Sequence, residues 1–331
     1  MTFLLVGNPS SQSGKNQARL ERALSLFRGA GARVELLATQ PAGRTLPLVT
    51  DALDRGGFDV VVAMGGDGTV REVAAGLHAS ARRDDVALGV LPTGTANDQG
   101  KSFGLSASPG ALADNVAVVL RGKETRLDAG LLRSSEDDAG ALFFDSAGWG
   151  LSARVLATRN RDRDVVAKLG PVKELYRDHA VYAGAFLKTF VDSYVVDDKL
   201  RAVGHLDGVA VDLGGLTDLI VKNTRVYAGA WVFDASARHD DGLFEVVPFA
   251  GKRDWASKAI LDLEGNPLTE AALNEIGVSH SRHFRASRIT LELFPPPGGA
   301  PLAAQIDGEE WPASTRVDVT VLPRALRLIV P

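Results

Sequence analysis

The chain has 331 residues, 45% of them hydrophobic and 24% charged, and its net charge is −4 at pH 7. A chain of this length and ordinary composition is long enough for about two globular domains, and wholesale disorder is excluded. The absence of cysteine excludes disulfides, thiolate metal sites and cysteine nucleophiles, and the small negative charge argues against nucleic acid as a partner.

The first part of the chain alternates strand-like and helix-like segments. One of them, Val60–Met64, is a continuous apolar run, which is typical of a strand buried on both faces. Apolar residues spaced three and four positions apart mark the helices. In chain order we expect strands at Phe3–Val6, Val34–Leu37, Val60–Met64 and Ala87–Leu91, alternating with helices around residues 20–27, 48–53, 70–77 and 112–120. This alternation predicts an α/β domain with a parallel sheet over residues 1–125.

Short β-rich segments separated by turn signals dominate the rest of the chain. The expected strands are Glu124–Leu132, Leu142–Ser146, Val203–Leu213, Thr224–Phe233, Leu243–Phe249, Ile289–Phe294 and Val317–Leu322. Such a pattern predicts an antiparallel β-sandwich or barrel over residues 126–322. A helical stretch with a wide apolar face, at residues 172–195, interrupts it.

Three polar loops follow three of the expected parallel strands, at residues 7–15, 65–69 and 91–98. For each loop the alternative is a turn with a helix cap, but in the second loop the glycine density and the position after a buried strand favour a ligand site over that alternative. The second loop, Gly-Gly-Asp-Gly-Thr, has a glycine density that lets the backbone approach a ligand closely, and its Asp67 can hold Mg²⁺ or accept a proton. In the first loop, Lys15 adds a positive charge to a helix N-terminus, which attracts anions. Together the three loops predict a nucleotide site at one edge of the sheet.

These loops and several later motifs resemble the diacylglycerol kinase catalytic-domain family, which includes bacterial lipid kinases, sphingosine kinases and ceramide kinases. The resemblance covers nearly the whole chain. It rests on Asn8-Pro9, Ser13-Gly14-Lys15, Gly65-Gly66-Asp67-Gly68-Thr69, Gly94-Thr95-Ala96-Asn97-Asp98, Asp128-Ala129-Gly130, Ala147-Gly148-Trp149-Gly150, Asp240-Asp241-Gly242 and Ile306-Asp307-Gly308-Glu309. NAD kinases also contain Gly-Gly-Asp-Gly-Thr, so this motif alone does not identify the family. The presence of both this motif and Asp-Gly-Glu near the end of the chain is a more specific signal.

The resemblance implies a fold and a reaction. The fold is an α/β nucleotide-binding domain of the phosphofructokinase or NAD kinase type, followed by a β-sandwich domain for the lipid, with residues 323–331 returning to the first domain. The reaction is phosphoryl transfer from ATP to a lipid hydroxyl in the cleft between the domains, with ATP and Mg²⁺ as the cofactors. The stretch at residues 172–195 then either packs on the sandwich or also forms a wall for an acyl chain.

The resemblance also implies roles for individual residues. Asp307 is the first choice for the base that takes the proton of the acceptor hydroxyl, although Asp307-Gly308 by itself is a hairpin signal, and Asp67 is the rival base. Asp67 would also face a Mg²⁺ carried by the nucleotide, Asp241 would bind a structural Mg²⁺, and Asp128 would lie near the site. The implied nucleotide contacts are Asn8, Ser13, Lys15, Gly65, Gly66, Asp67, Gly68, Thr69, Thr93, Gly94, Thr95, Asn97 and Glu309.

Five positions depart from the family pattern and affect the acceptor more than the nucleotide. Gln99 stands where an aromatic or apolar residue is usual, residues 100–102 replace an Ala-Arg type of continuation, and Asp145 stands where asparagine is common. The acceptor lipid, the choice between the two bases and the occupancy of the structural metal site therefore stay open.

We expect an ATP- and Mg²⁺-dependent lipid kinase that acts on diacylglycerol or a sphingoid-type lipid at a membrane surface. No segment reaches the roughly 18 apolar residues of a membrane-spanning helix, so we expect a cytoplasmic protein, with any membrane contact peripheral at the inner face. A homodimer is one candidate assembly. The alternatives are an NAD kinase-like enzyme and a catalytically weak regulator that binds a nucleotide or a lipid.

Overall fold

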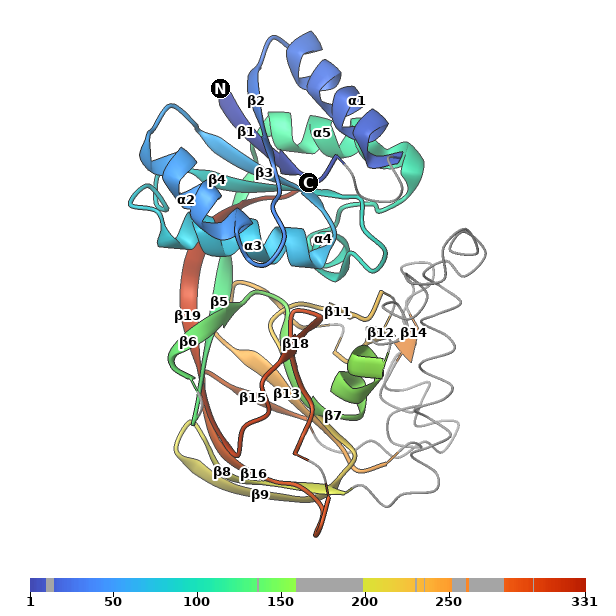
Figure 1. Cartoon of the computed structure of the whole chain (residues 1–331), viewed down its shortest axis with the longest axis vertical. Helices are drawn as coiled ribbons and strands as arrows, with labels where there is room; N and C mark the ends of the chain where they lie inside the picture. The colour runs from blue at the N-terminus through green and yellow to red at the C-terminus, as the bar shows by residue number, and fades with distance from the viewer. Residues whose placement is uncertain are drawn as a thin grey trace.

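The structure is a computed structural model that describes residues 1–9, 15–135, 137–158, 199–229, 231–234, 236–251, 260–261, 283–299 and 301–331. Two units lie one above the other and are joined by long strands (Figure 1). Ser13 and the helical stretch expected at residues 172–195 lie outside the described residues.

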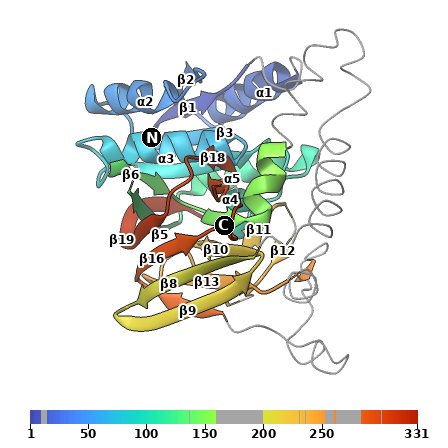
Figure 2. The same ribbon diagram turned by 60° about the horizontal axis from the view of Figure 1, so that its bottom comes forward.

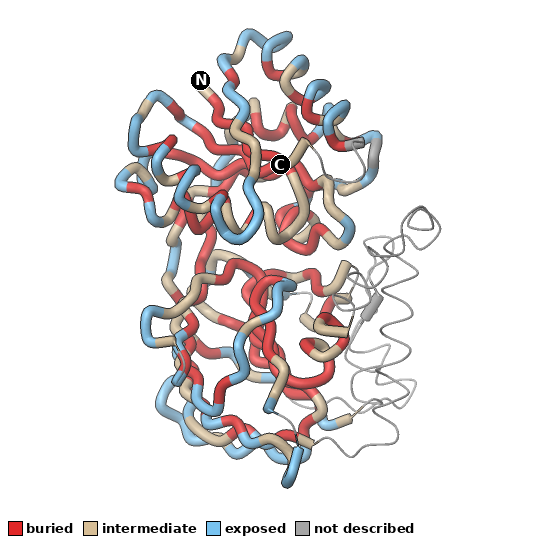
Figure 3. The backbone as a smooth tube through the Cα atoms, in the orientation of Figure 1, coloured by how far each residue is buried: buried red, intermediate tan, exposed pale blue. Residues whose placement is uncertain are grey.

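The first unit is the parallel α/β arrangement that the alternating pattern predicts. Its elements are β1 (Thr2–Gly7), α1 (Lys15–Gly29), β2 (Arg33–Ala38), α2 (Thr45–Asp54), β3 (Val60–Gly65), α3 (Asp67–Ala79), β4 (Ala87–Pro92), α4 (Asp98–Ser102), the short 3₁₀ helix η2 (Pro109–Ala111) and α5 (Leu112–Arg121). The parallel strands follow the order β2-β1-β3-β4. Helices α1 and α5 pack together on one face and α2 and α3 on the other, which is why β3 and β4 are buried along nearly their whole length (Figures 1 and 3).

The second unit is antiparallel, as predicted. Its strands are β5 (Glu124–Ser134), β6 (Asp137–Phe143), β7 (Ser146–Gly150), β8 (Leu200–Leu206), β9 (Val209–Leu216), β10 (Asp218–Lys222), β11 (Val226–Tyr227), β12 (Trp231–Val232), β13 (Phe244–Phe249), β14 (Ile260–Leu261), β15 (Phe284–Ala286), β16 (Arg288–Phe294), β17 (Ala304–Ile306), β18 (Glu309–Trp311) and β19 (Arg316–Ile329). Residues 151–158, directly after β7, are helical. One layer has the order β15-β13-β10-β7-β17-β18. It packs on the layer that contains β16, β8 and β19 through a core that includes Trp149, Phe244 and Leu291.

A single sheet runs through both units, because strand β19 belongs to both. Its first half pairs with β16 in antiparallel fashion, and its end pairs with β4 in parallel fashion, with Arg327 opposite Ala87. Strand β5 pairs with β19 over most of its length, so the two units are joined by a two-stranded ribbon (Figures 1 and 2). The expected boundaries at residues 125/126 and 322/323 therefore fall inside continuous strands. A bulge between Leu322 and Leu326, where Arg324 has a φ of 54°, bends the ribbon.

Candidate functional site

The loops that follow β1, β3 and β4 meet at one edge of the parallel sheet, because these strands are neighbours. The amide of Thr93 donates to the carbonyl of Gly65 (2.9 Å), which joins the second and third loops. A guanidinium nitrogen of Arg19, on α1, lies 3.5 Å from the carbonyl of Thr93. In the first loop, the carbonyl of Asn8 accepts a hydrogen bond from the side chain of Asn16 (2.7 Å), and Lys15 is the first residue of α1. The second and third predicted loops are thus brought together, α1 contacts them through Arg19, and residues 10–14 of the first loop lie outside the described residues.

Bare backbone forms the contact between the second and third loops. A Cβ atom at Gly94 would lie 2.9 Å from the amide nitrogen of Gly66 and closer still to its Cα, and a Cβ at Gly65 would lie 2.5 Å from Cβ of Thr69. A side chain at Gly94 would push the two loops apart, and one at Gly65 would collide with Thr69 within the second loop. Asn97, at a φ of 56°, closes the third loop on itself: its side chain accepts from the amide of Gly94 (2.8 Å) and donates to the carbonyl of Gly94 (2.9 Å). Asn97 therefore shapes the loop.

A hairpin from the second unit reaches these loops from the other side. Strands β17 and β18 are joined by Asp307 and Gly308, whose φ angles of 48° and 75° are those of a tight two-residue turn. The hairpin reading of Asp307-Gly308 is thus correct. A Cβ at Gly68 would lie 3.1 Å from Oε1 of Glu309, so the exposed Glu309 side chain lies over the glycine-rich loop of the first unit.

The carboxylate of Asp307 is buried and held by three backbone donors. Oδ2 accepts from the amide of Phe144 (2.9 Å), and Oδ1 accepts from the amides of Asp145 (2.8 Å) and Ser146 (2.9 Å). Burial, with a further contribution from the neighbouring charge of Asp145, raises the pKa of Asp307 to about 7, while Arg71 and the backbone donors oppose the rise. This carboxyl group is therefore fixed in position and close to half ionised at neutral pH.

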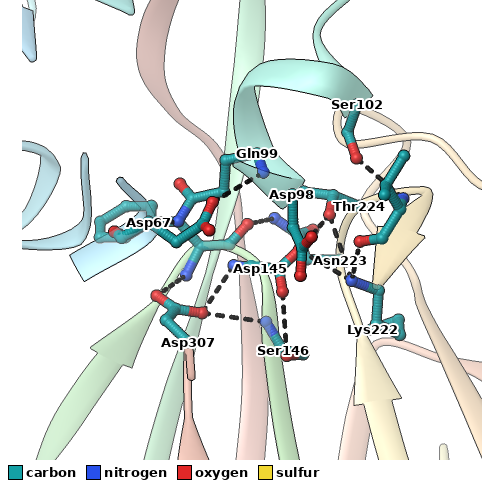
Figure 4. Close-up of polar contacts among 12 residues, drawn as sticks. Asp67, Asp98, Gln99, Ser102, Asp145, Ser146, Lys222, Asn223, Thr224 and Asp307 are labelled. Atoms are coloured by element: carbon teal, nitrogen blue, oxygen red, sulfur yellow. Dashed lines mark hydrogen bonds and ion pairs between the residues drawn. The ribbon is translucent and has the colours of Figure 1, made fainter. Parts of the chain in front are cut away.

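Three more aspartates lie beside Asp307: Asp98 and Asp145 are buried, and Asp67 is half-buried (Figure 4). Asp67, the first residue of α3, accepts from the amide of Gln99 (3.1 Å), and Asp98 accepts from the amide of Gly229 (2.6 Å). Burial raises the pKa of Asp67, and the negative charge of Asp145 raises it further. Burial also raises the pKa of Asp98 well above its usual value, with added repulsion from Asp67 and Asp145. The four carboxyl groups thus share one negative region.

A buried lysine enters this region from β10. Nζ of Lys222 lies 2.7 Å from Oδ1 of Asp145, and both side chains are almost fully buried. Thr224 also donates to that carboxylate, and the side chain of Asn223 donates to the carbonyl of Phe144 (2.9 Å). Asp98, Lys222, Asn223 and Thr224 were not predicted as site residues. For Lys222 the signal in the sequence is the position of a lysine at the end of the apolar run Leu219–Val221, and Asp98 belongs to the third loop motif.

A cleft of about 240 Å³ opens between the two units at this point. Its first wall is formed by Gly66, Asp67, Gly68, Thr95, Ala96 and Asp98 of the first unit. Its second wall includes Asp145, Ser146, Tyr227, Gln305, Asp307 and Glu309. A larger cavity of about 560 Å³ lies beside α4 and the end of β19 and has none of the predicted site residues in its lining. The chemistry is therefore expected in the smaller cleft.

Asp128 lies on the ribbon and is absent from the lining of the cleft. Its buried carboxylate accepts from the amides of Arg324 and Gly242, both at 2.6 Å. Burial is the main cause that raises the pKa of Asp128. The residue ties the bulge of β19 to the turn before β13, so its contacts are those of a structural residue.

The surroundings of Asp241 do not fit the expected structural magnesium. One of its oxygens is paired with the guanidinium of Arg285, and the other accepts from the amide of Leu243 (3.1 Å). The same guanidinium lies 3.4 Å from the buried carboxylate of Glu245. In the described part of the chain, no group of three or more His, Asp or Glu side chains is arranged to hold a metal ion. A positive side chain thus stands where the resemblance implies a cation.

None of the helices within the described residues is both long and apolar enough to cross a membrane.

Comparisons with known proteins point to one family. The sequence model of the diacylglycerol kinase catalytic domain matches residues 2–132. A "Probable lipid kinase YegS-like" of Pseudomonas aeruginosa (strain UCBPP-PA14) is 31% identical over 322 residues, which cover 97% of this chain and 91% of the relative. One of Klebsiella pneumoniae (strain 342) is 29% identical over 242 residues, or 72% of each chain. The crystal structure of a diacylglycerol kinase from Bacillus anthracis str. Sterne has the same fold, with a TM-score of 0.69 at 20% identity over 100% of this chain and 97% of that chain.

Proposed function

Since the chain belongs to the diacylglycerol kinase catalytic-domain family of lipid kinases, we propose that it transfers the γ-phosphate of ATP to a lipid hydroxyl, with Mg²⁺, in the cleft between its two units. The observation that carries this proposal is the meeting of Asp307 with the Gly-Gly-Asp-Gly-Thr loop across that cleft. A nucleotide-type loop then faces a buried carboxyl group with a pKa near neutrality, on two separate walls.

The nucleotide would bind with its phosphates against the bare backbone of residues 65–69 and 93–97. Helix α3 starts at Asp67, and the amides of its first turn attract anions. The donor set fits Mg²⁺: in nucleotide sites this ion takes one or two protein carboxylates besides phosphate and water oxygens, so Asp67 would suffice. Burial and the negative charge of Asp145 raise the pKa of Asp67, and a cation bound beside its carboxylate would oppose that rise. When bound, Mg²⁺ neutralises the phosphate charge that develops during transfer.

Asp307 is the group that we propose as the base. Its carboxylate accepts the proton of the lipid hydroxyl as the hydroxyl oxygen bonds to the γ-phosphorus, and the bond from that phosphorus to the bridging oxygen breaks, with its electron pair leaving on ADP. A pKa of about 7 suits a base that works near neutral pH. Its three backbone donors keep the carboxylate in one orientation. Asp67, on the nucleotide wall, is the rival base.

The acceptor would lie along the second wall. Leu156, Tyr227 and Ala228 offer apolar surface beside the hydroxyls of Ser146 and Ser152, which suits a lipid whose polar end carries the reacting hydroxyl. Diacylglycerol and sphingoid-type lipids are the acceptor classes that we propose, and both reside in membranes. We therefore also propose that the enzyme works at a membrane surface.

The test is transfer of label from γ-³²P-ATP, with Mg²⁺, to mixed micelles of diacylglycerol, sphingosine, ceramide or monoacylglycerol, and in parallel to NAD. The native protein is compared with Asp307→Asn, Asp67→Asn and Asp138→Asn, the last being the same change at an exposed aspartate of β6. We expect one lipid to be labelled by the native protein and the Asp138 variant and not by the other two. Labelled NADP would instead establish an NAD kinase-like enzyme. Absence of transfer to any lipid or to NAD, despite saturable ATP binding, would refute the proposal in favour of a regulator.

A further inference from the structure

The wall of the cleft that carries the proposed base contains a buried ion pair at a position where the sequence departs from the family pattern. Nζ of Lys222 lies 2.7 Å from Oδ1 of Asp145, and the two side chains are 2% and 4% exposed. Nζ also donates to the carbonyl of Val226 (2.7 Å) and lies 3.3 Å from Oγ1 of Thr224. The ammonium group thus has three oxygen partners and is almost fully buried, so the loss of either member would leave a buried charge without its partner.

Lys222 and the two residues after it hold the turn at Phe144 and Asp145. The amide of Asn223 donates to the carbonyl of Asp145 (2.8 Å), and its side chain donates to the carbonyl of Phe144 (2.9 Å). Thr224 donates to the Asp145 carboxylate, which also accepts from Ser146 Oγ (3.0 Å). Side chains and backbone from one short segment therefore fix both the backbone and the carboxylate of this turn (Figure 4).

The turn at residues 144–146 binds the proposed base, Asp307. The amides of residues 144, 145 and 146 are the three donors that bind the Asp307 carboxylate. Asp307 is on the hairpin between β17 and β18, more than 160 positions later in the sequence. Any shift of the turn would therefore move the donors that orient this carboxylate, without a change in Asp307 itself.

The segment after Lys222 also contacts the first unit. The amide of Val226 donates to Ser102 (2.8 Å), and Nζ of Lys101 donates to the carbonyl of Gly229 (2.5 Å). The amide of Gly229 donates to Asp98 at the start of α4 (2.6 Å). Residues 222–229 thus bridge the turn that holds the base and the helix that follows the third nucleotide loop.

From this geometry we infer that Lys222 is a positioning residue for phosphoryl transfer, which acts through its ion pair with Asp145 to hold the turn at residues 144–146 and thereby Asp307. The inference rests on the proposed function, because it takes Asp307 as the base. Without Lys222, Asp145 is a negative charge without its ammonium partner beside Asp67, Asp98 and Asp307, while Arg71 is a positive group that lowers the pKa of Asp307. When Lys222 and Asp145 are both replaced by neutral residues, no unpaired charge is left, and the turn at residues 144–146 keeps its contacts to Asn223.

The experiment is a double-mutant cycle of Lys222→Met, Asp145→Asn and the double variant, measured for kcat, for KM of ATP and for the midpoint of thermal unfolding. We expect Lys222→Met to lower kcat about a hundredfold, the effect of a displaced catalytic group, with KM for ATP changed less than about threefold. We expect the double variant to recover kcat to within about tenfold of the native protein, because it removes the unpaired charge. The acid limb of the kcat profile should move to higher pH in Lys222→Met and return in the double variant.

A matched control is the exposed pair of Arg201 and Asp212 on β8 and β9, with Nε 2.8 Å from Oδ1. The same cycle there, with Arg201→Met and Asp212→Asn, should leave kcat unchanged. Rescue of the unfolding midpoint without rescue of kcat would overturn the inference, since the pair would then serve folding alone. Strictly additive losses in kcat would overturn it as well. If the native protein labels no lipid, the proposed function fails, while the unfolding midpoints still test whether the two side chains act as a pair.

Discussion

Because the pKa of Asp307 is raised, the free energy of unfolding should depend on pH, and Asp307→Asn should remove this part of the pH dependence. The group has a pKa of about 7 in the folded chain against 3.8 as the ordinary value. A carboxyl whose pKa is raised by folding stabilises the folded state in its protonated form. Its contribution is complete below pH 3.8 and is lost as the pH rises through 7. By linkage it amounts to about 3 kcal/mol at pH 5 and close to zero at pH 8.

Asparagine at position 307 keeps one acceptor oxygen and tolerates the φ of 48°. Its amide NH₂ would face one of the three backbone donors and cost about 1–3 kcal/mol at every pH. We therefore expect the free energy of unfolding of the native protein to fall by about 3 kcal/mol relative to that of Asp307→Asn between pH 5 and pH 8. The pH-independent cost of the asparagine amide does not change this difference. The other carboxyls with raised pKa values, Asp67, Asp98, Asp128 and Glu245, are present in both proteins and largely cancel.

The assay is urea unfolding at half-unit steps from pH 5 to pH 8 without nucleotide, followed by the fluorescence of the four tryptophans. Asp138→Asn, at an exposed site, is the control and should run parallel to the native protein. Parallel curves for the native protein and Asp307→Asn, within about 1 kcal/mol, would show that this carboxyl is ionised in the folded state at pH 5. The assignment of Asp307 as a base tuned to neutral pH would then be wrong.

Three further outcomes are expected. Gly94→Ala should raise the KM for ATP at least about tenfold, because the new Cβ would collide with the backbone of Gly66. Gly110→Ala is the control and should leave the KM unchanged, because no atom lies within 4 Å of its new Cβ. Equal KM values for the two variants would refute the contact between the loops. Asp128→Asn should lower the free energy of unfolding by about 2 kcal/mol in urea titrations, because it leaves the amide of Arg324 or Gly242 without an acceptor, and an unchanged midpoint would contradict that. Since the proposed base has a pKa of about 7, kcat should fall about tenfold per pH unit below 6 and be level above 8, and a flat profile from pH 5 to 8 would argue against this base.

The fold and the contact between the second and third polar loops could be predicted because their signals are local. A continuous apolar run such as Val60–Met64 identifies a buried parallel strand, and the loops after neighbouring parallel strands must share one edge of the sheet. Nothing more than spacing and glycine content is needed for that step. The contact between Gly66 and Gly94 then follows from the pairing of β3 with β4.

The acidic region could not be predicted in the same way, because its members come from distant segments. Lys222 and Asp145 are 77 positions apart, and Asp307 is 161 positions from the donor at Ser146. Asp128 was expected near the site because of its motif alone. Its carboxylate is bound by the amide of Arg324 in the bulge of β19, and no local sequence pattern predicts that bulge. The family resemblance identifies residues that depart from its pattern, such as Asp145, and only the tertiary structure shows which residues they pair with.

The sharing of β19 between the two units has a consequence for biosynthesis. During synthesis β4 emerges more than 200 residues before the end of β19, its neighbour in the finished sheet. Until residues 316–329 are made, β4 is an open edge of a parallel sheet, a surface prone to pair with other chains. We expect nascent chains that end before residue 316 to be cleaved by protease within the first unit, and chains that include β19 to be protected there. The first unit would thus leave the ribosome with one edge of its parallel sheet unpaired, and β19 pairs with that edge once it has been made.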